Sequence, residues 1–336
     1  MKCAERSGKP IVYGWKGNFR KALMDLASVS RQLCHGISFS QHEPAPMLRL
    51  RTGENWNTEY LELNRSLNLE VGDLKFCLGY ITMNRDGSRN VLPCPKNKAL
   101  RTGTQCESCR RLDHSKFMHH FHKTGEAPEG MRKYLEQPHF LYIASFAHGA
   151  TKVGTTSTQS QWTRLAQQGA VIARYIARAN DGTAIRVLED LVTEHVGLSQ
   201  QVRQKSKIKG LVGWELDYQQ LDTINEQAAN QTRDFLATQR GLENYGVQLL
   251  DQLWEQPSFA RPVIDAWNTR SLHAWSSTVA GSRQKLCIRG VLGQSVMADS
   301  GEGTTLRLLD AAELKTREVE LSEERGEFQE EQSALF

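Results

Sequence analysis

The sequence predicts an α+β protein built from several small units. Four of the seven cysteines lie between residues 77 and 109. Strand and helix patterns alternate over residues 139–197, and β-type patterns return at 271–321 after a polar helical stretch. The expected units are an α/β segment at 1–70, a zinc-binding module at 71–130, an antiparallel sheet flanked by helices at 137–212, a helical segment at 213–262, a small C-terminal β element at 270–322 and a disordered acidic tail at 323–336.

Composition excludes several classes of protein. Hydrophobic residues make up 39% and charged residues 24% of the 336 residues, and the mean hydropathy is −0.52. These values indicate a folded core with many polar loops. No apolar run reaches the roughly 18 residues of a membrane-spanning helix. Residues 1–17 also lack the apolar run of a secretory signal. We therefore expect a cytoplasmic protein without a membrane partner.

The net charge of +4 is small, but it is unevenly distributed. Residues 94–123 contain seven Lys or Arg and only two acidic residues. Every second residue over 203–209 is basic, whereas 318–331 is strongly acidic. This distribution fits an anionic partner such as nucleic acid, or simply two surfaces that are solvated differently.

The cysteines predict a metal site rather than disulfides. An odd number of cysteines without a signal peptide favours a reducing compartment. Cys106 and Cys109 form a CxxC pair in a loop rich in Pro, Gly, Thr and Asn, and no apolar strand feeds a helix there, which argues against a redox pair. With Cys94 upstream, this pair offers three of the four thiolates of a tetrahedral zinc site.

The fourth zinc ligand is left open by the sequence. Cys77 comes first and His114 second, and His119, His120 and His122 are further alternatives. A closed set of four ligands leaves no open position for water, so we expect structural rather than catalytic zinc. The alternative is that these cysteines are free thiols in a polar loop.

Residues 139–197 carry the clearest pattern of secondary structure. The predicted order is a hairpin, a helix, a strand and a second helix, at 139–154, 157–168, 170–177 and 181–196. Further along, the basic alternation at 203–209 favours a solvated or phosphate-facing strand or loop. Residues 214–254 have helical spacing, and residues 271–321 indicate a small antiparallel sheet.

Two tripeptides of the hairpin, Leu141-Tyr-Ile143 and Lys152-Val-Gly154, are followed by Arg164 in the first helix and Glu189 in the second. This arrangement resembles the GIY-YIG nuclease superfamily. More closely, several pieces resemble an uncharacterised bacterial family that joins a cysteine cluster to such a core. These pieces are Cys77-Leu-Gly, Pro93-Cys-Pro95, Gln105-Cys-x-x-Cys109, Leu141-Tyr-Ile-Ala-x-Phe, Lys152-Val-Gly, Gln168-Gly-Ala170 and Ile288-Arg-Gly-x-x-Gly-Gln294.

The resemblance implies a GIY-YIG-like endonuclease, a hydrolase of phosphodiester bonds. In that superfamily a hairpin Tyr assists the base, an Arg contacts phosphate and a Glu holds a divalent ion. Tyr142, Arg164 and Glu189 match these positions, and Glu189 would hold a catalytic Mg²⁺. Gly154 matches a glycine that lets a ligand approach the backbone. Lys152 stands where the second tripeptide usually has Tyr, and Leu141 stands where the first has Gly.

Other interpretations use the same residues. Lys205 and Lys207 are further candidates for phosphate contacts. Tyr142 could be a packing residue, Arg164 could lie on an ordinary helix face, and Glu189 could only pair with Arg186. At the level of function, the alternatives are a non-catalytic nucleic-acid-binding module and an enzyme that acts on a small molecule with the same scaffold.

Overall fold

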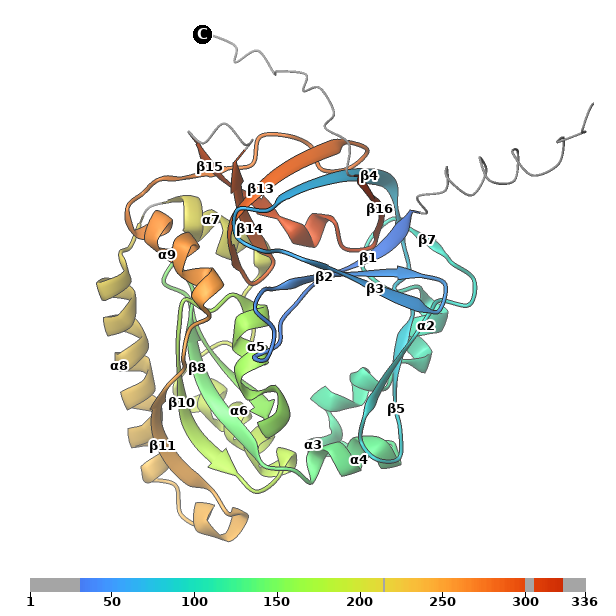
Figure 1. Cartoon of the computed structure of the whole chain (residues 1–336). Helices are drawn as coiled ribbons and strands as arrows, with labels where there is room; N and C mark the ends of the chain where they lie inside the picture. Colours follow the sequence, from blue (N-terminus) through green and yellow to red (C-terminus); the bar gives the residue numbers. More distant parts are fainter. Residues whose placement is uncertain (1–30, 214, 300–304, 323–336) are drawn as a thin grey trace, which may run out of the picture.

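The computed structural model describes residues 31–213, 215–299 and 305–322 (Figure 1). Residues 1–30 of the expected α/β segment and the acidic tail at 323–336 lie outside the described residues. Within the described part the fold is a mixture of strands and eight α-helices, which confirms the α+β class. Figure 1 shows a large sheet at the top, a smaller sheet with its helices at the lower left and the cysteine-containing module at the lower right.

The large sheet has ten strands, and it is built from both ends of the described chain. Its order is β12-β15-β14-β13-β4-β16-β1-β2-β3, with β7 paired to β4, and all described pairs are antiparallel except β12 with β15. The strands are β1 (Gln32–Ser38), β2 (Met47–Thr52), β3 (Asn55–Tyr60), β4 (Ser66–Phe76), β7 (Ala99–Leu100), β12 (Leu272–Ala274), β13 (Arg283–Leu292), β14 (Ser295–Asp299), β15 (Leu306–Asp310) and β16 (Arg317–Ser322).

This sheet corrects the expected division of the chain. The segments at 1–70 and 270–322 are not separate units, because β16 lies between β4 and β1, and β13 pairs with the other edge of β4. The described residues before 70 form strands only, without a helix. The physical reason is that each strand edge must satisfy its backbone hydrogen-bonding groups, and here the partners come from the opposite end of the described chain.

The cysteine-containing module follows β4. It consists of a hairpin, short helices and a very small core of Phe121, Met131 and Leu135. Its elements are β5 (Tyr80–Met83), β6 (Arg89–Leu92), α2 (Glu107–Leu112), α3 (Phe121–Thr124) and α4 (Glu129–Leu135). A core of this size buries too little apolar area to hold a fold alone, so an additional crosslink is expected to stabilise it.

The second sheet has four antiparallel strands in the order β11-β10-β8-β9. The hairpin, helix, strand and helix follow one another as the sequence predicts. The strands are β8 (His139–Ser145), β9 (Thr151–Ser157), β10 (Ile172–Ala179) and β11 (Gln248–Leu253). The helices after the hairpin are α5 (Gln161–Gln168), α6 (Gly182–His195), α7 (Gln204–Gly213), α8 (Tyr218–Ala237) and α9 (Arg261–Asn268).

The alternation of side chains along β8 gives the small sheet two different faces. Leu141 and Ile143 pack in a core that includes residues of α6 and α8. Tyr142 points to the opposite face and belongs to the core shared with α5 and the ten-stranded sheet. The side chains that the resemblance singles out on β8 and β9 therefore lie where the two sheets meet.

Two sequence expectations differ from the structure in this region. Residues 248–253 form β11, the fourth strand, although their spacing suggested a helix. The basic run at 203–209 lies mostly in α7, because Ile208, Leu211 and Val212 have helical i, i+3, i+4 spacing and contact the main core. An alternation of charges over seven residues is compatible with a strand and with a helix. Here the spacing of the apolar residues determines that the segment forms a helix.

A backbone contact joins the two sheets. Gly169 ends α5 with a φ of +65°, and Gly293 turns β13 into β14 with a φ of +60°. A Cβ atom at Gly293 would lie 2.7 Å from the Cα of Gly169. The next residue, Gln294, accepts a hydrogen bond from the Ile37 N–H and donates one to the Ile37 carbonyl, each at 3.0 Å. The same turn therefore anchors the small sheet and β1.

We expect Gly293→Ala to lower the free energy of unfolding by about 2–4 kcal/mol, because it adds a backbone clash to the penalty of a left-handed φ. Gly53→Ala is the matched control, since Gly53 has a φ of +58° but no atom lies within 4 Å of the place that a Cβ would take there. That variant should lose only about 1 kcal/mol. Urea unfolding measures both values, and equal losses would show that the glycine contact contributes nothing.

Candidate functional site

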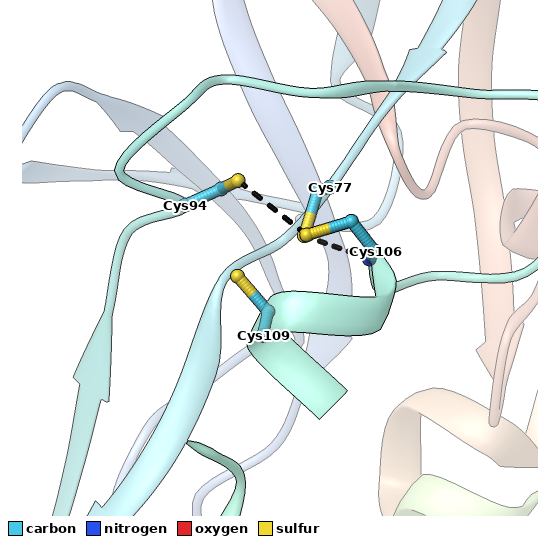
Figure 2. A group of neighbouring side chains, drawn as sticks. All are labelled: Cys77, Cys94, Cys106 and Cys109. Carbon is cyan, nitrogen blue, oxygen red and sulfur yellow. Dashed lines mark hydrogen bonds between the residues drawn. The ribbon is translucent and has the colours of Figure 1, made fainter. Parts of the chain in front are cut away.

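Four cysteines from distant parts of the sequence meet in the small module (Figure 2). Cys77 directly follows β4, Cys94 lies in the turn between β6 and β7, and Cys106 and Cys109 lie at the start of α2. Their Sγ atoms all lie within 4.8 Å of one another. The structure thus brings together the four cysteines that the sequence analysis selected.

Backbone geometry positions the first of these cysteines. The N–H groups of Gly79 and Cys106 point at Cys77 Sγ, at 3.4 Å and 3.2 Å. Gly79 has a φ of +85°, and a Cβ there would lie 1.8 Å from the Leu92 carbonyl oxygen. Only glycine lets the Cys77 loop approach the loop that carries Cys94 so closely.

The thiols differ in their acidity. Burial raises the pKa of Cys77 and, more strongly, that of Cys109. A hydrogen bond from the Cys109 backbone, with contributions from the neighbouring thiols, lowers the pKa of Cys106 to about 7. A bound cation would favour the thiolate form of all four, since thiolates are the metal-binding form of cysteine.

The donor set fits a tetrahedral metal site. Four sulfurs at about 2.3 Å from a zinc ion would be separated by about 3.8 Å, and Cys94 Sγ and Cys106 Sγ lie 3.9 Å apart. Two of the alternative ligands have other partners: His114 Nδ1 accepts a hydrogen bond from the Met83 N–H, and His122 Nε2 lies 3.0 Å from Asp190 Oδ2. The four cysteines can therefore hold a metal such as zinc.

The second candidate site surrounds the β8–β9 hairpin. Tyr142 is fully buried, its backbone pairs with Gly154, and its hydroxyl accepts a 2.6 Å hydrogen bond from Gln168 Nε2. A Cβ at Gly154 would lie 2.4 Å from Tyr142 Oη. A side chain is excluded at position 154 because the Tyr142 ring occupies the space. The resemblance had suggested that the glycine leaves room for a ligand.

Three cations gather beside this tyrosine, and we call Lys152, Arg164 and Lys207 the basic cluster. Lys152 is 6% exposed, and its Nζ donates to the Gln200 carbonyl at 3.0 Å. Lys207 Nζ donates to the Gln168 carbonyl at 2.7 Å. Arg164, on α5, is exposed. Burial, together with the charges of Lys152 and Arg164, lowers the pKa of Lys207 to about 7.

Glu189 lies at the edge of this cluster. It is 3% exposed and forms an ion pair with Arg186, one turn earlier on α6. Burial raises its pKa, while the charges of Arg186, Lys152 and Arg164 act in the opposite direction. Tyr142, the basic cluster and Glu189 thus lie in one region. Glu189 also forms the ion pair with Arg186 that the sequence analysis named as the alternative to metal binding.

The residues around the basic cluster differ from the phosphate-binding residues that the sequence suggested. Lys205 is exposed two positions from Lys207, on a different face of α7, where its charge acts on Asp310. Gln168 and Gln200, which hold the two lysines through their carbonyl groups, were not predicted. Two signals pointed to Gln168: its place before the glycine that ends α5, and the piece Gln168-Gly-Ala170 of the resemblance.

The fold and the site geometry therefore define an α+β protein with a four-cysteine cluster and a partly buried basic cluster. The profile of the family DUF2797, described as a protein of unknown function, matches residues 65–256. This is more than half of the chain, and the protein belongs to that family. No curated protein and no solved structure matches the chain. Among the described residues, no helix has the length and apolar character needed to cross a membrane.

The cysteine cluster should bind one metal ion per chain. We expect Cys106→Ser to lose this ion and to unfold at a markedly lower temperature, because the binding energy of a structural metal is also folding energy. The matched control is Cys287→Ser, since Cys287 is buried but lies outside the cluster. Elemental analysis and thermal unfolding measure both effects. A metal-free parent protein, purified without chelator and under reduction, would refute the site.

Proposed function

We propose that this protein binds the phosphodiester backbone of nucleic acid at the basic cluster of a GIY-YIG-like core, next to a module held together by structural zinc. One observation carries the binding proposal. Lys152 is buried and Lys207 is half-buried, and each Nζ is paired with a neutral carbonyl oxygen instead of a carboxylate. Buried cations are normally paired with anions, so an anionic ligand would complete the site.

The arrangement of elements supports a GIY-YIG-like core. β8 pairs with β9 on one side and β10 on the other, α5 lies between the hairpin and β10 in the chain, and α6 follows β10. Arg164 is on the first of these helices and Glu189 on the second. This is the order of elements and side chains that the sequence resemblance implies.

The proposal is restricted to binding for chemical reasons. The Tyr142 hydroxyl, the expected base, is buried and accepts a hydrogen bond from Gln168. A Mg²⁺ ion takes oxygen ligands and keeps several waters. Glu189, the residue expected to hold this ion, forms an ion pair with Arg186. The neighbouring Asp190 contacts His122 and Lys123. The proposal therefore assigns no role to magnesium.

Zinc is the metal that best fits the cysteine cluster. Four thiolates form a closed tetrahedral set, which is typical of structural zinc and leaves no position for a reacting water. Among the described residues, the core of the module around the cluster consists of three buried side chains and four partly buried ones packed against them. A zinc ion would supply the crosslink that this core lacks.

Arg164→Ala should weaken nucleic-acid binding about tenfold while the fold persists, because the side chain is exposed and its guanidinium suits phosphate. The slope of log affinity against log salt should fall by about one. Fluorescence anisotropy with labelled 20-nucleotide DNA and RNA measures binding, and gels with and without Mg²⁺ measure cleavage. Arg261→Ala, at an exposed arginine on α9, is the control.

The outcomes separate the candidate functions. Salt-sensitive binding that requires Arg164 and leaves the nucleic acid intact supports the proposal. Magnesium-dependent cleavage that Glu189→Gln abolishes would restore the endonuclease interpretation. Failure of the parent protein to bind either nucleic acid would overturn the proposal and favour a small-molecule ligand.

Binding should also weaken as the pH rises from 6 to 8.5. The pKa of Lys207 is lowered to about 7 by burial and by the charges of Lys152 and Arg164. Its positive charge is therefore present below that pH and is lost above it. A bound phosphate raises the pKa, so the loss of affinity should be centred at or somewhat above pH 7. Lys207→Arg keeps its charge throughout, and its affinity should change much less with pH. Parallel pH profiles for parent and variant would contradict this assignment.

A further inference from the structure

We propose that the β2–β3 hairpin carries a stacking platform for an unpaired nucleobase, formed by Trp56 together with the guanidinium groups of Arg49 and Arg51 that contact its ring. This inference rests on the proposed function, and it narrows the ligand to single-stranded nucleic acid. The platform is on the ten-stranded sheet and shares no residue with the basic cluster.

The register of the hairpin places these side chains together. Arg51 pairs with Trp56 and Arg49 with Thr58, so both arginines and the tryptophan lie on one face of the two strands. The guanidinium carbons of Arg49 and Arg51 lie 4.9 Å and 4.8 Å from the centroid of the Trp56 ring. The ring of His35 lies 4.6 Å away, edge-on. Nevertheless, Trp56 is 37% exposed.

The charge around the ring is positive. Among the described residues, neither Arg49 nor Arg51 takes part in an ion pair, and Glu54 acts on Arg51 only at longer range. Arg51 is oriented by hydrogen bonds from its side chain to the carbonyls of Gly53 and Val91. Burial and the charges of Arg51, Lys315 and Arg49 lower the pKa of His35 to about 4. His35 is thus an uncharged aromatic ring at neutral pH.

An unpaired base linked to phosphates matches this combination. A base can stack on the exposed part of the indole, and a flanking phosphate can meet the charge of the half-buried Arg49. Arg51 is only 6% exposed and supports the ring from within the protein. Bases in a duplex are already stacked and are not available to such a surface. β3 is also the edge strand of its sheet, so the strand that carries Trp56 has one side without a neighbouring strand.

A comparison of two probes isolates stacking from phosphate binding. The probes are a labelled 20-nucleotide oligothymidine and an abasic strand of equal length, which has the same phosphates but no bases. We expect the parent protein to bind oligothymidine more tightly than the abasic strand. Trp56→Ala should lower the affinity for oligothymidine about tenfold and leave that for the abasic strand unchanged. Anisotropy gives the affinities, and thermal unfolding verifies the fold.

Two further variants sharpen the test. Arg49→Lys keeps the charge but removes the planar guanidinium, so it should weaken oligothymidine binding more than abasic binding. Tyr245→Ala removes an aromatic side chain that is 64% exposed elsewhere, and it should change neither affinity. If the parent binds both probes through Arg164 and Trp56→Ala has no effect, the platform is wrong and the proposed function stands. If the parent binds neither probe, both are wrong.

Discussion

The backbone contact between Gly169 and Gly293 is the constraint on which the basic site depends. It holds the end of α5 against the turn between β13 and β14, at a distance that no side chain would allow. The residue just before this contact, Gln168, donates to the Tyr142 hydroxyl through its side chain and accepts from Lys207 through its carbonyl. The packing of the two sheets and the position of the half-buried Lys207 therefore depend on the same short segment of chain.

The basic cluster is costly for folding stability because its two lysines are not paired with carboxylates. Lys152 and Lys207 are held by carbonyl oxygens, which orient an ammonium without neutralising it. The carboxylate at the edge of the site, Glu189, is already paired with Arg186. Burial lowers the pKa of Lys207, and the charges of Lys152 and Arg164 lower it further. A site of this kind gives up folding stability in the free protein and recovers it when an anion binds.

Sequence reasoning predicted the elements from β8 to α6 because each has its own periodicity and its own end, such as Gly169 after α5. It also found the four cysteines, since a CxxC pair restricts the remaining donors to a few nearby residues. The position of β16 could not be predicted, because nothing within 317–322 identifies β1 and β4 as its neighbours. Gln168 and Gln200 were missed for a related reason. Their contacts with Lys152 and Lys207 form only when elements that are distant in the sequence pack together.

The place of β16 in the large sheet has a consequence for biosynthesis. β1 and β4 emerge early from the ribosome, but the strand that fills the gap between them is made last of all the described elements: Gln32 pairs with Val319. The four-stranded sheet and the cysteine module have mostly local partners, and they can fold while the chain is still growing. Until β16 is made, the edges of β1 and β4 that it will cover remain open to unwanted pairing with other chains. The yield of correctly folded protein therefore depends on the time between the synthesis of β1 and β4 and that of β16, during which these strand edges must not pair with other chains.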